Sequence, residues 1–431
     1  MSSHWKNLGI LKKRYDIPLE AIVKSDLLRM GISFSDQTLQ KTVTCKAKSY
    51  FIFSFDRALQ KDLSAQSRHA TPEEIALSGG PENFKRTIVS VRLNPKSPYH
   101  VDYQVLAPTA NPLTLFYLDE KICDVSLPSL PDYYKEKLSN GKPVSDIAPT
   151  IEWGYLIYIT AFRLCQYWGS KEECRFCDIN ENYRQQKKKR SYTAVKTIEE
   201  VLEALEIIQT NDTQKISRAY TVSGGSITTN LNGKTESTFY ASYAKAIEKK
   251  FPGRWIGKAN VQALVLDDVK KLKEAGYQIY HPNYEVWDQS LFRTLCPGKE
   301  RHVGRAEWIK RTLDAAEIFG PSHVIPNFVA GVEMSEPYGF KTVPEAIQST
   351  AEGLEFFMSK GICPRFTVWC VEPNTVLCQT NTEPPPLEYF VNLLQVYRDT
   401  HRKYKLPVPP GYGLPGIGKA VFSVSAFMDV L

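Results

Sequence analysis

The sequence predicts an α/β protein whose central part is an incomplete (β/α)6 barrel. Short apolar or β-branched segments recur between about residues 151 and 371, and helix-like segments with an apolar period of about 3.6 residues separate them. Alternation of this kind is typical of parallel strands joined by right-handed crossovers. Six such units are present, which is too few for the closed eight-stranded barrel.

The expected strands are short and apolar, as strands buried on both faces are. They are residues 155–162, 216–223, 254–259, 278–284, 323–331 and 365–371. A capping box, Thr197-x-x-Glu200, opens the apolar stripe of the first intervening helix, and Thr342-x-x-Glu345 opens another. In parallel α/β architectures the chemistry lies at the carboxyl ends of the strands, so the residues that follow these segments are the candidates for a site.

The flanking sequence does not continue this alternation. Residues 1–150 contain strand-like segments among loops rich in Pro and Ser, and we expect a separate α+β domain there. Residues 151–380 form the predicted barrel. Residues 381–431 are expected to form a C-terminal helix, from about Leu387 to Tyr404, and a tail rich in Gly and Pro.

Composition excludes several classes of protein. The apolar share of 42% and the charged share of 23% are ordinary, which excludes disordered and fibrous chains. No apolar run approaches the roughly 20 residues that span a bilayer, and the first residues do not resemble a signal peptide, so we expect no membrane association and a cytoplasmic location. The net charge of +7 is mild, and nucleic acid is not an expected partner. The basic run Lys187–Arg190 is interpreted as a solvated loop, with binding of RNA or an anionic substrate as the alternative.

Three of the nine cysteines lie close together after the first predicted barrel strand. Cys165, Cys174 and Cys177 have the spacing C-x8-C-x2-C, and thiolates in such a group suit an iron–sulfur cluster. Three thiolates can hold three irons of a cubane and leave the fourth open to a ligand. The alternative is a zinc site, for which His281 or His302 would have to supply a fourth ligand.

With these cysteines the chain resembles the radical SAM superfamily over about residues 151–380. Members bind a [4Fe–4S] cluster on three cysteines, more often spaced C-x3-C-x2-C, with an aromatic residue before the third. Phe176 occupies that place, and the longer first spacing departs from the common pattern. The resemblance implies that Cys165, Cys174 and Cys177 hold the cluster and that S-adenosylmethionine is the second cofactor.

Two further segments resemble S-adenosylmethionine contacts of the superfamily. Thr221–Ser226 is similar to the glycine-rich motif that receives the methionine amino group, and the resemblance implies contacts from Ser223, Gly224, Gly225 and Ser226, although many members have Glu at the last place. Tyr280-His-Pro-Asn283-Tyr-Glu285 is similar to the strand end of biotin synthase, the related hydrogenase maturase and methylornithine synthase.

The same subgroup suggests three more contacts. An acidic residue, here Glu285, would contact the polar groups of S-adenosylmethionine, and an arginine would pair with its carboxylate. Arg305 is the first candidate for this arginine and Arg311 the second. Val329–Glu333, with Gly331, resembles the segment that lies along the adenosine, and Phe366–Thr375 resembles the last strand of the subgroup.

The expected function is reductive cleavage of S-adenosylmethionine to a 5′-deoxyadenosyl radical, which abstracts hydrogen from a small-molecule substrate. Ferredoxin or flavodoxin would supply the electron. C–C bond cleavage or rearrangement is one outcome; methyl transfer, with Cys296 or Cys370 as an extra catalytic cysteine, and sulfur insertion are the alternatives. An RNA-modifying or RNA-binding iron–sulfur protein is the alternative from another class.

Overall fold

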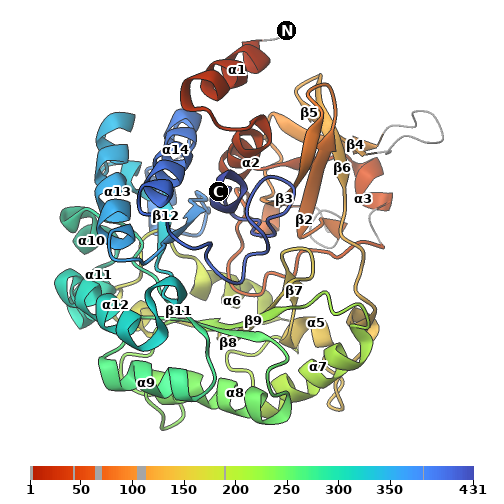
Figure 1. Ribbon diagram of the computed structural model, residues 1–431. Helices are drawn as coiled ribbons and strands as arrows, with labels where there is room; N and C mark the ends of the chain where they lie inside the picture. Colours follow the sequence, from red (N-terminus) through yellow and green to blue (C-terminus); the bar gives the residue numbers. More distant parts are fainter. Residues whose placement is uncertain (1–2, 42–43, 64–69, 104–112, 189–190, 382) are drawn as a thin grey trace.

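A row of parallel strands forms the centre of the computed structural model, which describes residues 3–41, 44–63, 70–103, 113–188, 191–381 and 383–431 (Figure 1). One sheet has the order β11-β10-β9-β8-β7, in which β8 to β11 are parallel and β7 is antiparallel. A second, two-stranded sheet pairs β12 with β13 in parallel. The strands are β7 (Thr150–Ile151), β8 (Leu156–Phe162), β9 (Ala219–Gly224), β10 (Ile256–Val261), β11 (Ile279–Pro282), β12 (Asn327–Ala330) and β13 (Arg365–Val368).

Two isolated parallel bridges connect the sheets. Tyr280 pairs with Val324, and Glu285 pairs with Phe328, so the segment around β12 continues the row after β11. The six predicted barrel strands therefore occur in sequence order, and each overlaps its expected segment. In the described part of the chain, β13 does not pair with β8. This arrangement confirms the predicted α/β class with an open, incomplete barrel.

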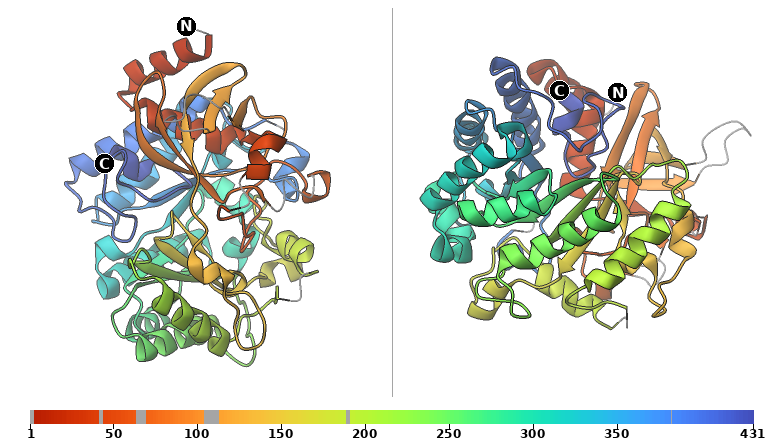
Figure 2. Two further views of the ribbon diagram at one scale, coloured as in Figure 1. Left: turned by 90° about the vertical axis from the view of Figure 1, so that its right-hand side faces the viewer. Right: turned by 60° about the horizontal axis from the view of Figure 1, so that its bottom comes forward.

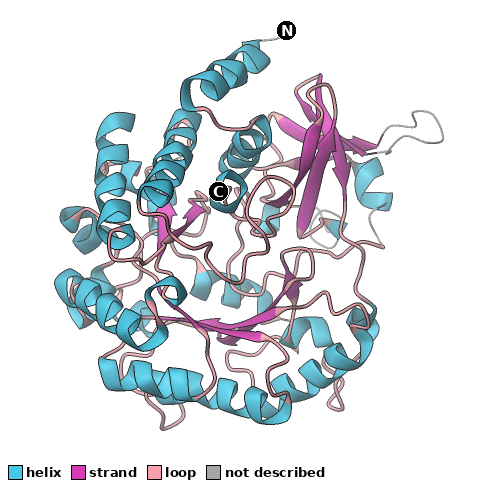
Figure 3. Cartoon of the chain, in the orientation of Figure 1, coloured by secondary structure: helices cyan, strands magenta, loops and turns pink. Residues whose placement is uncertain are grey.

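Helices cover the outer side of these strands (Figure 3). They are α7 (Ile198–Asn211), α8 (Glu236–Lys250), α9 (Leu266–Glu274), α10 (Gln289–Leu295), α11 (Pro297–His302), α12 (Arg305–Phe319), α13 (Val343–Met358) and α14 (Leu387–Lys403). Both predicted capping boxes form, at Thr197 with Glu200 and at Thr342 with Glu345. Each box satisfies amides in the first turn that have no partner within the helix.

The N-terminal residues form a six-stranded sheet of their own, in the order β1-β4-β5-β6-β2-β3. Its pairs are antiparallel except for β1 with β4. The elements are α1 (Ser3–Tyr15), α2 (Leu19–Met30), β1 (Ser33–Phe34), α3 (Asp36–Lys41), β2 (Glu74–Gly79), β3 (Phe84–Ser90), β4 (Tyr99–Tyr103), β5 (Leu113–Tyr117) and β6 (Glu120–Ser126). α5 (Val144–Ile147) and a 3-10 turn (Asp132–Lys135) lead into the barrel.

The C-terminal segment lies between the barrel and the N-terminal sheet (Figure 2). The Val368 amide of β13 donates to the Val424 carbonyl at 3.1 Å, and the Ser90 amide of β3 donates to the Ser423 carbonyl at 3.0 Å. On the other side, the carboxylate of Glu74 in β2 accepts from two amides of the turn before β8. The N-terminal sheet and the C-terminal segment therefore cover the side of the barrel that its strands leave open.

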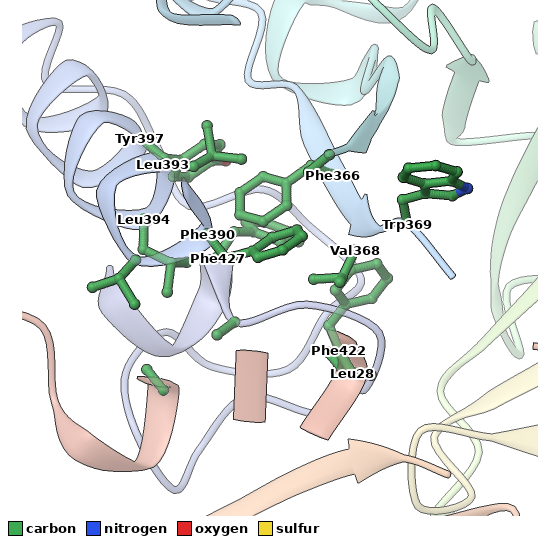
Figure 4. Close-up of a cluster of buried hydrophobic side chains, with 14 of the residues drawn as sticks. Leu28, Phe366, Val368, Trp369, Phe390, Leu393, Leu394, Tyr397, Phe422 and Phe427 are labelled. Carbon is green, nitrogen blue, oxygen red and sulfur yellow. The ribbon is translucent and has the colours of Figure 1, made fainter. Parts of the chain in front are cut away.

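One continuous apolar core joins these parts. Figure 4 shows Leu28 of α2, Phe366 of β13, Phe390 of α14 and Phe427 of the C-terminal segment in one cluster. The same core extends through β2 and β3 to α1. Residues 1–150 thus form their own sheet but share their core with the C-terminal third of the chain, and the division into three domains stays a prediction.

No described helix combines the length and the apolar character that crossing a membrane requires.

We expect removal of the Asp429 carboxylate to destabilise the fold. Lys24 Nζ lies 2.9 Å from Asp429 Oδ2, both side chains are 1% exposed, and the pair links α2 to the 3-10 helix Phe427–Val430. Asp429→Ala leaves a buried ammonium without its counter-charge, which lowers the free energy of unfolding by roughly 3–5 kcal/mol. Urea denaturation measures this change. Glu206→Ala is the control, because its pair with Lys250 is exposed and contributes at most ~1 kcal/mol; equal effects of both variants would contradict the prediction.

Candidate functional site

The cysteine loop follows β8 directly and returns to α6 (Ile179–Gln186). The Cys165 amide donates to Asn180 Oδ1 at 2.8 Å, and the Cys177 amide donates to the Cys174 carbonyl at 2.9 Å. The loop also rests on the segment before α11, because the Arg175 amide donates to the Leu295 carbonyl at 2.9 Å. The backbone of the loop is therefore fixed from two sides.

All three cysteines of the loop line one cavity of about 240 Å³. Phe176, Ser223, Gly224, Gly225, Ser226, Asn283 and Glu285 line it as well. The structure thus brings together ten of the twelve site residues that the sequence predicts. They come from the carboxyl ends of β8, β9 and β11, where parallel α/β architectures place their chemistry.

The thiols of the loop act on one another electrostatically. Burial raises the pKa of Cys165 to about 12, and the charge of Cys174 adds to this rise. Burial also raises the pKa of Cys177 well above its ordinary range, with further contributions from Cys174 and Cys165. Three thiolates so placed repel one another and need a bound cation to be stable. The donor set fits an iron–sulfur cluster, which supplies that positive charge.

The glycine pair at the end of β9 packs directly against the cysteine loop. The Tyr240 hydroxyl would lie 2.6 Å from a Cβ added to Gly224. A Cβ at Gly225 would overlap the Leu164 carbonyl and the Cα atom of Cys165. Only a residue without a side chain allows this approach, so the glycines set the position of the first cysteine.

Glu285 forms a buried ion pair in the cavity wall. Its Oε1 lies 2.5 Å from Lys299 Nζ, and both side chains are about 90% buried. Lys299 also donates to the Asn283 carbonyl at 2.8 Å, and the charge of Glu285 raises the pKa of Lys299 despite the opposing effect of burial. Asn283 Oδ1 is buried and has no hydrogen-bond partner among the described residues. This wall therefore offers a carboxylate, an ammonium and a free amide oxygen.

Two predicted contacts lie elsewhere. The Arg305 guanidinium donates from Nε to the Trp287 carbonyl at 3.0 Å and stacks on the Trp287 indole, so it does not line the cavity. The second choice, Arg311, is held by Glu307 and the Ala263 carbonyl. Gly331 adopts a φ of +99° and faces Phe390, outside the cavity lining.

Sequence reasoning missed Lys299 and several cavity-lining groups from distant elements. Lys299 follows the Cys296-Pro297 pair in α11, and only this neighbourhood could have indicated it. Glu236, in the first turn of α8, accepts from the Ile227 amide at 2.7 Å, and burial raises its pKa to about 7. The aromatic segment 51–55 also lines the cavity, and nothing in its sequence signals this.

The remaining candidates take different places. Cys370 lines the cavity and is buried. Cys296 is buried against Cys174. His281 and His302, the candidate fourth zinc ligands, contact the Ile325 carbonyl and the Glu172 carboxylate, respectively. Of the basic run, Lys189 and Arg190 lie outside the described residues.

Within the described residues, no group of three or more His, Cys, Asp or Glu side chains is positioned to hold a single metal ion. The thiolate ligands of a cubane bind irons at separate corners, so they need not meet around one point as the ligands of a single ion do.

We expect Gly225→Ala to disturb the cysteine loop. The new methyl group would force the Leu164–Cys165 backbone away from β9 and so displace the first thiolate. Iron content after anaerobic reconstitution should fall to less than about half of the parent's, because three thiolate ligands are needed to hold the cluster. Gly169→Ala, in the same loop but with no atom within 4 Å of the added Cβ, is the matched control. Parent-like iron binding by Gly225→Ala would show that this contact does not position Cys165.

Comparison with known proteins gives structural likenesses only. No protein family and no curated protein matches the sequence. Among solved structures, a maturase of the [FeFe]-hydrogenase has a TM-score of 0.38 at 17% identity, with 58% of this chain and 49% of that chain covered. Methylornithine synthase has a TM-score of 0.41 at 13% identity, with 61% and 75% covered. Coproporphyrinogen III oxidase from Escherichia coli, described as a radical SAM enzyme, has a TM-score of 0.35 at 14% identity, with 58% and 52% covered.

This chain spans about half the length of the maturase and of the oxidase. A hydrogenase maturase and methylornithine synthase are also among the enzymes that the strand end at Tyr280–Glu285 resembles in sequence. Because all three TM-scores lie below 0.5, the function must be argued from the chain's own residues.

Proposed function

We propose that this protein is a radical SAM enzyme that holds one [4Fe–4S] cluster on Cys165, Cys174 and Cys177. One observation carries the proposal: the three cysteines line a single cavity at the carboxyl ends of parallel barrel strands. With S-adenosylmethionine bound, such a cluster supplies reductive cleavage to methionine and a 5′-deoxyadenosyl radical. The barrel proposed for this role comprises residues 151–380.

The protein's own residues bind and orient the second cofactor. Asn283 Oδ1 can accept from the methionine amino group, and Glu285 adds negative charge beside it. Lys299 takes the cationic role that the sequence suggested for Arg305, because its ammonium lies in the cavity wall and can face the methionine carboxylate. Gly224 and Gly225 allow backbone to approach the ligand closely.

Apolar side chains of the cavity wall would limit the access of water to the place where a radical would form. Phe51, Phe53, Phe176 and Trp369 line the cavity with apolar surface. A reactive carbon-centred radical is protected there from side reactions with solvent. A cavity of about 240 Å³ suits a small-molecule substrate. Ferredoxin or flavodoxin is the proposed electron donor, in the cytoplasm.

C–C bond cleavage or rearrangement needs no further metal centre and is the reaction we propose. Methyl transfer is the second candidate, because the buried thiol of Cys370 lines the same cavity. Formation of S-adenosylhomocysteine by the parent, and its absence in Cys370→Ala, would establish methyl transfer. Sulfur insertion from an auxiliary cluster would instead be indicated if the protein contained more iron than one cubane and lost the excess during turnover.

The cluster is tested by metal analysis. Anaerobically reconstituted protein should contain about four irons per chain, and Cys165→Ala, Cys174→Ala and Cys177→Ala should each abolish the chromophore. With strong reductant and S-adenosylmethionine, the parent should form 5′-deoxyadenosine and the variants should not. Cys378→Ala is the control, because this thiol lies outside the cavity lining. Zinc bound in place of iron, with the same cysteines required, would refute the proposal.

Cofactor binding is tested separately. Glu285→Gln should weaken S-adenosylmethionine binding by about ten- to hundredfold while the cluster still assembles, because a charge-assisted contact contributes roughly 1.5–3 kcal/mol. Equilibrium binding to the reconstituted protein measures this. Arg305→Ala should bind as the parent does, since its guanidinium is held by Trp287 away from the cavity. The opposite ranking of the two variants would restore Arg305 as the cofactor ligand and exclude Glu285.

A further inference from the structure

The cavity has a second end, away from the cysteine loop. Here its lining comes from the beginnings of β8, β12 and β13, from the turn before β8, and from the C-terminal segment around Phe422. The proposed cofactor contacts do not use any of these groups. Two charged residues of this end, Glu152 and Arg365, have buried polar atoms without hydrogen-bond partners among the described residues.

Glu152 is held in the wall by its backbone. Its backbone φ is +55°, and that of the next residue, Trp153, is +58°. Residues other than glycine rarely adopt this left-handed backbone conformation. The Glu74 carboxylate stabilises this turn by accepting from both amides, at 2.7 and 2.8 Å. Strained residues of this kind persist where the surrounding structure fixes them, often at ligand sites.

The Glu152 side chain lacks the partners that its burial demands. The residue is 3% exposed, it lines the cavity, and its Oε2 has no donor among the described residues. Burial raises the pKa of this carboxyl, and the charges of Lys258 and Arg365 oppose that rise, but neither residue donates a hydrogen bond to Oε2. The Lys258 ammonium instead donates to the Gly411 carbonyl at 2.5 Å and lies over the Tyr412 ring. A buried carboxylate without donors is costly, so a ligand that brings an N–H donor would be favoured at this point.

Arg365 is the second charged residue at this end, and it lacks a hydrogen-bond acceptor. Its Nη1 donates to the Tyr412 hydroxyl at 3.1 Å, while its buried Nε has no acceptor among the described residues. The Phe422 ring centre lies 5.7 Å from the guanidinium carbon and limits where the side chain can move. An anionic group in the cavity would complete the hydrogen bonds of this guanidinium.

Apolar and aromatic groups make up much of the remaining wall at this end. Leu156, at the start of β8, lies two residues before Tyr158, and Tyr158 packs against Phe51 with ring centres 4.6 Å apart. This apolar cluster extends from Ile151, beside Glu152, to Cys165 and Cys177. Such a wall favours a hydrocarbon portion of a ligand over a polar one. Glu152, Arg365 and this apolar wall together fit a molecule with one cationic end, one anionic end and an apolar middle.

We propose that this end of the cavity binds a small dipolar molecule, with an ammonium or similar N–H cation at Glu152 and a carboxylate-like anion at Arg365. The identification of this ligand as the substrate of the radical rests on the proposed function. The binding itself depends only on Glu152, Arg365 and the aromatic wall. A ligand so held would be oriented at both ends, and its apolar middle would face the interior from which hydrogen is abstracted.

Calorimetric titration of the reconstituted protein with three probes of equal chain length tests this assignment. 6-Aminohexanoate carries both charges, hexanoate only the anion and hexylamine only the cation. 6-Aminohexanoate should bind at least about tenfold more tightly than either single-charge probe, as expected when each charge-assisted contact contributes. No binding of 6-aminohexanoate at millimolar concentration, or equal binding of the three probes, would overturn the proposal.

Variants identify the residues that carry the effect. Glu152→Gln should weaken 6-aminohexanoate about tenfold and leave hexanoate unchanged, whereas Arg365→Gln should weaken both carboxylates and leave hexylamine unchanged. Glu206→Gln, at an exposed ion pair, is the matched control. Parent-like binding by both variants would refute the site.

Iron content and thermal unfolding, measured on each variant, reveal any that has lost its fold. If Arg365→Gln does not fold, Arg365→Lys takes its place, because lysine keeps the charge but lacks the planar guanidinium that pairs with a carboxylate; unchanged 6-aminohexanoate binding in Arg365→Lys and in Glu152→Gln would also refute the site. If the parent holds no cluster but the probes rank as expected, the radical SAM proposal fails and this binding site stands.

Discussion

The unpaired edge of β13 is the constraint on which the rest of this structure depends. Parallel strands that do not close into a barrel leave backbone amides and carbonyls without partners, and buried groups of this kind must be satisfied. The C-terminal segment satisfies part of the edge through the bond from Val368 to Val424, and it reaches the N-terminal sheet through Ser423. The ends of the chain are therefore required to complete the barrel wall, which explains why the apolar core runs continuously from α1 to the last residues.

Closing the wall buries the side chains of Glu152, Glu236, Glu285 and Lys299, and burial raises the free-energy cost of a charge that has no partner. The charged groups of the cavity differ in how they are stabilised. Glu285 and Lys299 neutralise each other, and Glu236 accepts from backbone and side-chain donors. The thiols of Cys165 and Cys177 are contacted only by backbone amides and repel one another, and Glu152 Oε2 has no hydrogen-bond donor within the described residues, so these groups are compensated less completely. Buried groups left in this state are the ones for which a bound partner is the simplest physical explanation.

Features encoded in contiguous sequence could be predicted. The strand segments, both capping boxes and the placing of the cysteines beside the glycine pair follow from local patterns and from the rule that parallel strands end on one side. Arg305 shows the limit of this reasoning, because its position near a helix start suited a carboxylate ligand, but packing on Trp287 directs it elsewhere. Lys299 and the segment 51–55 reach the cavity through tertiary contacts for which a single sequence carries no local signal.

The N-terminal sheet gains a physical role from this arrangement. β2 contributes Glu74, which holds the strained turn that carries Glu152, while the loop before it contributes Phe51, which packs on Tyr158. A barrel without this sheet would still contain the cysteines, the glycine pair and the Glu285 wall, because all of these belong to the barrel strands and their loops. What it would lack is the support of the turn at Glu152 and the apolar wall around Phe51, which also borders the cysteine loop. The parts of the chain outside the barrel therefore determine which molecule the cavity accepts, and the barrel strands determine what chemistry it can perform.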